Sequence, residues 1–234
     1  MTNLLINDLK DHIVPIMYGE ENAPKGNDVL LEQWGDCYVG YAVVFQQIEG
    51  LEINRLKKDG LEMMGITMDE LRDLAYKNLQ QKDPVIFTEM VNIFTGTAGI
   101  MPTDFSNLGN LEIRNMYVLT TKSKTYGAAA VLLDGILESI SDAFGTGVYI
   151  LPSSVHECII LSSEFVPDID AHLKMVRDIN RSEVEPEERL SNSVYVYDRD
   201  LGRVRRYSDG EYFELNGDLC EHQLGNSGDI TTLF

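Results

Sequence analysis

Hydrophobic residues recur at different spacings along the chain, and each spacing predicts one kind of element. Near the N-terminus they recur every four positions, at Leu5, Leu9, Ile13 and Met17. This spacing predicts a short amphipathic helix that ends or kinks at Pro15. After a predicted loop at Gly19–Asn27, the segment Cys37–Gln47 is rich in aromatic and β-branched residues, which predicts a strand buried on both faces.

A second helix is indicated by a start signal as well as by spacing. Thr67 and Glu70 match a capping box, in which each side chain accepts a hydrogen bond from a backbone N–H of the first turn. Apolar residues then follow at helical spacing: Met68, Leu71, Leu74, Ala75 and Leu79. Beyond Pro84, Ile86–Phe94 predicts a short helix, and Thr95–Asn110, rich in Gly, Thr, Asn and Pro, predicts a loop or a subdomain boundary.

From residue 115 onward, short strands and helices alternate. Strands are predicted at Met116–Thr121, Gly127–Leu133, Gly147–Leu151 and Glu157–Leu161. Val194–Asp198 and Arg203–Tyr207 are predicted to form a further hairpin around a turn at Arg199–Gly202. One predicted helix follows Asp134 as its N-cap and ends at Gly145, and another follows Asp168. The turn that joins Gly147–Leu151 to Glu157–Leu161 is predicted at Pro152–His156.

The order of these elements predicts an α+β fold, in which hairpins build an antiparallel sheet and helices pack mainly on one face. We divide the chain into an N-terminal α/β subdomain, residues 1–110, and a C-terminal subdomain of hairpins and helices, residues 111–234. One continuous domain is the alternative.

Four motifs fall in the C-terminal half: YVL (Tyr117–Leu119), GAAAVLL (Gly127–Leu133), YILPSSVHE (Tyr149–Glu157) and EVEPEERLSNSVYVYD (Glu183–Asp198). Together they resemble an uncharacterised bacterial family that is filed only as a domain of unknown function. The resemblance covers residues 115–200, and residues 65–78 resemble the middle part of that family. It implies a cytoplasmic protein of bacteria or their mobile elements, and it brings no activity, cofactor or catalytic residue.

The charge of the chain limits the classes of molecule that it is expected to bind. The sequence has 38 acidic and 19 basic residues, a formal net charge of -19. Such a chain repels nucleic acid and anionic membranes and attracts basic partners, so we expect no direct nucleic-acid binding and no membrane. The alternative is that the acidity serves only solubility.

No apolar run reaches the roughly 18–20 residues of a membrane-spanning helix, and acidic residues interrupt the N-terminal apolar stretch, so we expect a cytoplasmic protein. The widely spaced Cys37, Cys158 and Cys220 predict free thiols and no zinc site. The glycines form neither a dinucleotide fingerprint nor a phosphate-binding loop. We therefore expect no cofactor and no metal.

One cluster has the residue types of a catalytic site. Ser153, Ser154, His156 and Glu157 place two hydroxyls, an imidazole and a carboxylate within one predicted turn. A hydrolase needs a nucleophile, a base within hydrogen-bond reach and a group that orients the base. Side chains that satisfy the backbone of a tight turn explain the same residues without catalysis.

Two charged clusters suggest contact with a partner. The acidic one comprises Glu183, Glu185, Glu187 and Glu188, and the basic one comprises Arg203, Arg205 and Arg206. They are interpreted either as docking patches or as one internal ion-pair network, and the alternative is solvated loop and edge-strand charge.

These observations favour a non-enzymatic module that binds a protein partner through acidic surface. A sharper version is an inhibitor, carried by a mobile element, that occupies the basic groove of a nucleic-acid-binding partner. The alternatives are a hydrolase that uses the Ser153–Glu157 turn, and a structural or regulatory domain whose acidity serves only solubility. The oligomeric state stays open.

Overall fold

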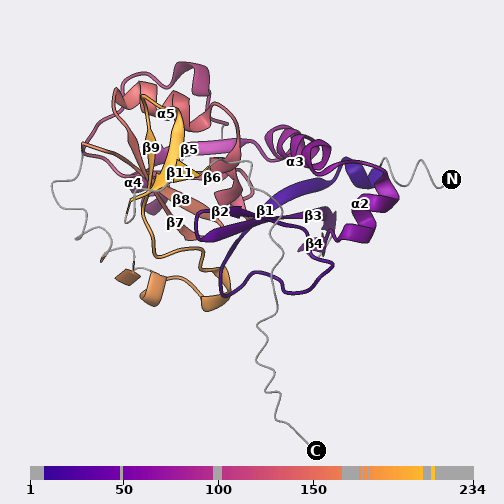
Figure 1. Ribbon diagram of the computed structural model, residues 1–234. Coiled ribbons are helices and arrows are strands. Elements are labelled where there is room, and N and C mark those ends of the chain that lie inside the picture. The colour runs from indigo at the N-terminus through magenta and orange to yellow at the C-terminus, as the bar shows by residue number, and fades with distance from the viewer. Residues whose placement is uncertain are drawn as a thin grey trace, which may run out of the picture.

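The computed structural model describes residues 8–47, 50–96, 102–164, 174, 177–178, 180–207 and 212–213. The described strands form two antiparallel sheets, one of four strands and one of seven, and helices pack against them (Figure 1). The predicted α+β class is therefore confirmed.

The four-stranded sheet is built around one long strand. Its strands are β1 (Ile13–Gly19), β2 (Leu31–Trp34), β3 (Cys37–Gln47) and β4 (Gly50–Arg55). β3 pairs with each of the other three, and its bounds match the predicted strand.

The predicted N-terminal helix extends too far: residues 8–10 are helical, but Ile13–Gly19 is strand β1 and pairs with β3 along its whole length. A spacing of four residues also fits a strand, in which every second side chain shares a face. Ile13 and Met17 do lie in one core cluster, while Ile16 and Tyr18 lie in another. Pro15 is tolerated because β1 is an edge strand in the order β1-β3-β2.

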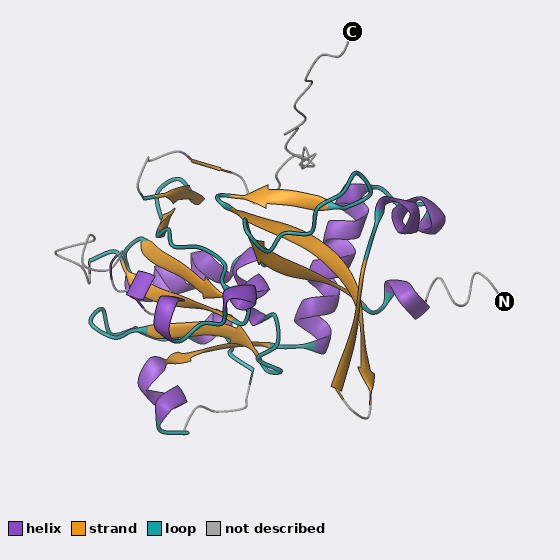
Figure 2. Ribbon diagram, turned by 90° about the horizontal axis from the view of Figure 1, so that it is seen from below, coloured by secondary structure: helices purple, strands orange, loops and turns teal. Residues whose placement is uncertain are grey.

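Two helices follow this sheet, α2 (Lys58–Met64) and α3 (Met68–Lys82), and Figure 2 shows α3 lying alongside the strands. The predicted capping box is confirmed: Glu70 N–H donates to Thr67 Oγ1 at 3.2 Å, and Thr67 N–H donates to Glu70 Oε2 at 2.8 Å. The buried side chains of α3 are Leu71, Ala75, Asn78 and Leu79.

The seven-stranded sheet has the order β11-β10-β9-β7-β8-β6-β5. Its strands are β5 (Val85–Glu89), β6 (Tyr117–Thr121), β7 (Val148–Ser154), β8 (Glu157–Ser162), β9 (Tyr195–Asp198), β10 (Arg203–Arg206) and β11 (Tyr212–Phe213). The helical elements in this part are α4 (Met90–Phe94), η1 (Phe105–Asn107), η2 (Gly127–Leu132), α5 (Ile136–Phe144) and η3 (Pro186–Glu188). The predicted strands at 116–121, 157–161, 194–198 and 203–207 agree with this sheet to within one residue at each end.

Several predicted elements differ in this half. The helix predicted at 86–94 begins as strand β5 and becomes α4 only at Met90. The strand predicted at 127–133 is the buried 3₁₀ helix η2, because the run is made of small residues that pack closely: a Cβ on Gly127 would lie 2.6 Å from His156 O. Asp134 does not cap α5, whose N-cap is Gly135, whereas Gly145 ends α5 as predicted.

The strand predicted at 147–151 continues to Ser154, so the turn that joins β7 to β8 is shorter than the predicted 152–156. Most of the helix predicted after Asp168 lies outside the described residues, as does most of the chain after 207. The division at residue 110 stays a prediction; β5, which precedes it, pairs with β6, which follows it.

The two sheets share one hydrophobic core. A single cluster of buried residues includes Ile13 and Trp34 from the first sheet and Ile150, Tyr195 and Val204 from the second. The rings of Trp34 and Tyr195 lie 4.6 Å apart between their centroids. The sheets are thus held by direct packing of aromatic side chains.

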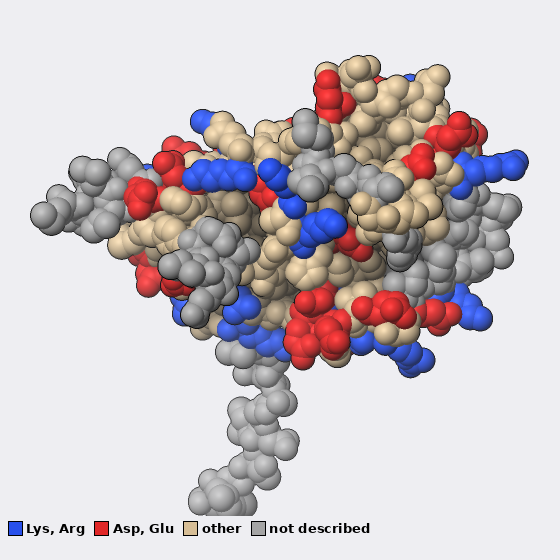
Figure 3. All heavy atoms as spheres, turned by 180° about the vertical axis from the view of Figure 1, so that it is seen from behind, with Lys and Arg blue, Asp and Glu red and all other residues tan. Residues whose placement is uncertain are grey.

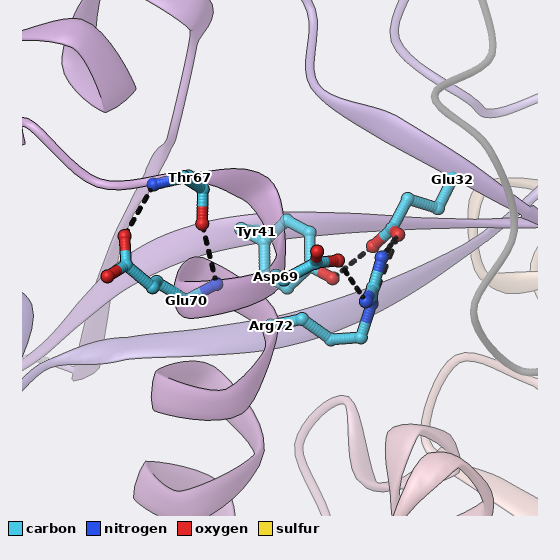
Figure 4. Close-up of polar contacts among 6 residues, drawn as sticks. All are labelled: Glu32, Tyr41, Thr67, Asp69, Glu70 and Arg72. Carbon is cyan, nitrogen blue, oxygen red and sulfur yellow. Dashed lines mark hydrogen bonds and ion pairs between the residues drawn. The ribbon is translucent and has the colours of Figure 1, made fainter.

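A buried polar network fastens α3 to the first sheet (Figure 4). The Glu32 carboxylate on β2, only 3% exposed, accepts hydrogen bonds from two nitrogens of Arg72 and, at its second oxygen, from the Tyr41 hydroxyl. Arg72 Nη1 also donates to Asp69 Oδ1 at 2.9 Å. Burial raises the pKa of Tyr41, so its hydroxyl keeps its proton and remains a donor.

We expect Arg72→Ala to lower the free energy of unfolding by about 3–5 kcal/mol, because it leaves the Glu32 carboxylate buried without its cation. Urea denaturation measures this change. The control is Lys77→Ala on the exposed face of the same helix, for which we expect a change within about 0.5 kcal/mol. Equal effects of the two variants would mean that Glu32 is solvated rather than paired.

Candidate functional site

One stretch of chain, residues 186–193, runs between the two sheets, and we call it the strap. On one side it pairs with the end of β7. Val155 N–H donates to Glu188 O at 2.8 Å, and Leu190 N–H donates to Ser153 O at 3.4 Å. The strap therefore extends the seven-stranded sheet locally by backbone hydrogen bonds.

On its other side the strap touches the loop that leaves β1. Asn22 Nδ2 donates to Pro186 O at 2.7 Å. Gly19 comes so close that a Cβ at this position would lie 2.4 Å from Arg189 O and 2.5 Å from Leu190 O. Only glycine permits such an approach of two backbones, so this residue fixes the contact between β1 and the strap.

The β2–β3 turn forms a further wall beside the strap. Gly35 has a φ of 63°, and a Cβ there would lie 2.4 Å from the Tyr195 ring. The next residue, Asp36, accepts hydrogen bonds from the Tyr195 hydroxyl and, at 2.6 Å, from Ser193 Oγ. Burial raises the pKa of Tyr195, which keeps its hydroxyl protonated as the donor to Asp36.

These three segments enclose a polar pocket of about 290 Å³. It is lined by Gly19, Glu20, Glu21, Asn22, Asp36, Asn180, Arg189, Leu190, Ser191 and Asn192. The lining comes from the end of β1 and the loop after it, from the β2–β3 turn, from Asn180 and from the strap, and three of its side chains are carboxylates. We take this pocket as the candidate functional site, because it is concave and brings charged groups from distant parts of the sequence together.

Asn180, one of the lining residues, carries a buried polar atom without a partner among the described residues. Its side chain is 2% exposed, and its Nδ2 donates to Ser191 O at 2.8 Å and to Asn192 Oδ1 at 3.1 Å. Among the described residues, its Oδ1 is buried and has no hydrogen-bond partner. A buried acceptor without a donor is costly, so this atom favours a ligand that donates to it.

The predicted catalytic turn meets the predicted acidic cluster. His156 Nε2 lies 3.1 Å from Glu188 Oε1, and Tyr126 N–H donates to His156 Nδ1 at 3.3 Å. Ser154 Oγ accepts from the His156 backbone N–H at 3.2 Å rather than contacting its ring. Both ring nitrogens of His156 are therefore engaged, and neither is free to take a proton from Ser153 or Ser154.

Glu157, the fourth residue of this turn, is half-buried at the start of β8. Burial raises the pKa of its carboxyl above the ordinary value of 4.5, while the charges of His156 and Lys124 act in the opposite direction. The carboxylate is therefore less favourable here than in water.

The acidic cluster is larger in space than in sequence. Glu187 in the strap and Glu183 and Glu185 just before it are exposed, and the hydrogen bond from Asn22 to the strap brings exposed Glu20 and Glu21 to the same region. We call these five glutamates the acidic rim. Figure 3 shows acidic side chains along the lower edge of the back face, with basic side chains between and beside them.

The predicted basic cluster lies on β10. In the sheet order, β9 separates β10 from β7, the strand with which the strap pairs. β10 pairs with β9 and β11, and of the three arginines only Arg203 is fully exposed, while Arg205 and Arg206 are half-buried. No ion pair between these arginines and the acidic cluster occurs among the contacts described for residues 180–207.

Sequence reasoning missed Glu20, Glu21, Asp36 and Asn180 as site residues. No linear motif connects them, because the hydrogen bonds that assemble the pocket join residues more than 150 positions apart. The glycines gave the only indirect signal, since Gly19 and Gly35 sit where a side chain would collide.

Three further observations concern the described part of the chain. No group of three or more His, Cys, Asp or Glu residues there is arranged to hold a metal ion. Cys37 and Cys158 are free and buried, and burial raises the pKa of both thiols, which disfavours the reactive thiolate. No described helix has both the length and the apolar character needed to cross a membrane.

Comparison with known proteins identifies a family. A family model described as "Family of unknown function (DUF5688)" matches residues 4–199, which include both sheets up to β9, the strap and the whole pocket lining. The match begins far before the segment 115–200 that carries the motifs quoted above. No curated protein and no solved structure matches the chain.

We expect Glu157→Gln to raise the melting temperature at pH 7. Because the folded pKa of Glu157 lies above the unfolded one, its favourable contribution is complete below the unfolded pKa near 4.5 and is lost as pH rises through the folded value. A permanently neutral glutamine avoids this loss, so the gain should vanish toward pH 4.

Calorimetry of parent and variant between about pH 4 and about pH 8 measures this difference. The exposed Glu164→Gln is the control, with an expected change within about 2 °C throughout. A lower melting temperature of Glu157→Gln at pH 7 would show that the ionised carboxylate has a stabilising partner.

Proposed function

Since the chain belongs to a family of unknown function, we propose its function from its own geometry: a cytoplasmic, non-enzymatic module that binds a basic protein partner through the acidic rim. The observation that carries this proposal is the convergence of two acidic segments on one edge. Glu20 and Glu21 come from the loop after β1, and the other three glutamates come from residues 183–187.

The rim is suited to a partner rather than to internal stability. Glu183, Glu185 and Glu187 are exposed, and no described contact pairs their carboxylates with a cation of the chain. Like charges held together on a fixed scaffold repel one another, and a basic partner relieves that repulsion. Electrostatic complementarity of this kind mainly accelerates association and selects the partner.

The turn at Ser153–Glu157 supports binding more than hydrolysis. Val155 and Ser153 hold the strap by backbone hydrogen bonds, and His156 contacts the Glu188 side chain. The turn thus positions the acidic segment, and the hydroxyl of Ser154 is used within the turn itself.

We expect affinity for basic nucleic-acid-binding proteins to weaken steeply between about 50 mM and about 200 mM salt, and nucleic acid to compete for them. Replacing Glu183, Glu185 and Glu187 by glutamine should weaken binding on the order of tenfold at the lower salt concentration. Fluorescence anisotropy with a panel of such proteins measures both effects.

The matched control removes three negative charges elsewhere, at the exposed positions Glu62, Asp73 and Glu138. This triple variant should bind within about twofold of the parent, because the three residues lie on α2, α3 and α5 and not in the acidic rim, and salt screens exposed charges that do not contact the partner. Binding that is insensitive to salt, or weakened equally by both triple variants, would contradict a partner site at the rim.

A further inference from the structure

We propose that the polar pocket beside the strap binds a guanidinium group, the arginine side chain of the basic partner. This inference rests on the proposed function and deepens it, because it assigns one specific contact to a surface otherwise defined only by charge. Its starting point is the set of hydrogen-bonding groups that line the pocket.

The side chains that line the pocket offer hydrogen-bond acceptors, while the amide groups of two of them already donate within the protein. Nδ2 of Asn22 already donates to Pro186 O, and Nδ2 of Asn180 donates to Ser191 O and Asn192 Oδ1. The acceptors include the buried Oδ1 of Asn180, which has no partner among the described residues. A ligand that only donates hydrogen bonds matches this lining, and a ligand rich in acceptors does not.

The charge of the lining also favours a ligand of this kind. Glu20, Glu21 and Asp36 contribute three carboxylates, and Arg189 is the cation among the ten lining residues. Two nitrogens of the Arg189 guanidinium are already committed, Nε to Val184 O at 3.0 Å and Nη2 to Arg181 O at 3.4 Å. The balance of charge in the pocket therefore favours a cation.

The shape and hydration of a guanidinium favour arginine over lysine at this site. The volume of the site, about 290 Å³, lies at the lower end of the range for small-molecule sites, which suits one long side chain. A guanidinium presents five N–H groups in a planar fork, so it can reach a buried acceptor and exposed carboxylates together. It is also more weakly hydrated than an ammonium, which lowers the cost of burying it near Asn180.

The test titrates the full chain with N-acetyl-L-arginine amide and, separately, with the citrulline amide, a neutral analogue of nearly the same shape. We expect the arginine probe to shift the backbone amide NMR signals of Asn22, Leu190 and Asn192 in a saturable way. The citrulline probe should leave these signals unchanged, because it lacks the charge that the carboxylates attract.

Variants locate the interaction. Glu20→Gln/Glu21→Gln should weaken the arginine probe at least about fivefold, whereas the equally charged control Glu62→Gln/Asp73→Asn should change it less than about twofold. Asn180→Ala removes the buried acceptor and should abolish saturable binding. Its melting temperature is measured first, and the exposed Glu20/Glu21 pair tests the site even where Asn180→Ala does not fold.

Equal shifts by the two probes, or equal weakening by the two double variants, would overturn the guanidinium site. These measurements need no protein partner, so they are independent of the salt-dependent binding that tests the rim. If the rim binds basic proteins but the pocket does not bind the arginine probe, the proposed function still holds. Only the guanidinium site is then contradicted.

Discussion

The packing of Tyr195 against the β2–β3 turn is the constraint on which the site depends. Its ring packs on Trp34, its hydroxyl donates to Asp36, and the absence of a side chain at Gly35 leaves room for it. One buried residue thus makes both the ring contact and the hydrogen bond to the first sheet. Together these two contacts define how the sheets lie relative to each other. The strap, the pocket and the acidic rim are all placed by that position.

The network around Glu32 lies on the same face of the same sheet, two residues before Trp34 in β2. Its carboxylate pairs with Arg72 of α3 while the next residues of β2 lead to Trp34 and the turn. One short strand therefore carries both an ion pair that orients a helix and an aromatic contact that orients a second sheet. Compared with an apolar replacement, a buried charge pair contributes little net stability, but removing one partner is costly because the other charge stays buried alone.

The sequence was informative where a local rule decided the structure. The capping box at Thr67, the β-branched run of β3 and the α+β class could all be predicted, because turn chemistry and side-chain shape act over a few residues. Ile13–Gly19 could not, since its spacing fits a helix and a strand equally and pairing with β3 decided between them. The acidic segment at 183–188 was found as a charge run, but Glu20 and Asn180 join the site only through tertiary contacts.

The hydrogen bond from Asn22 to Pro186 spans 164 positions of sequence, and this separation bears on the order in which the protein is made. Residues near the N-terminus leave the ribosome first and can pair locally as β1, β2 and β3, but the loop after β1 has no strap to contact until some 160 further residues have been synthesised. Contacts of such long range form late and slow folding. A nascent or truncated chain would thus present its glutamates without the pocket, and recognition would be reserved for the finished molecule.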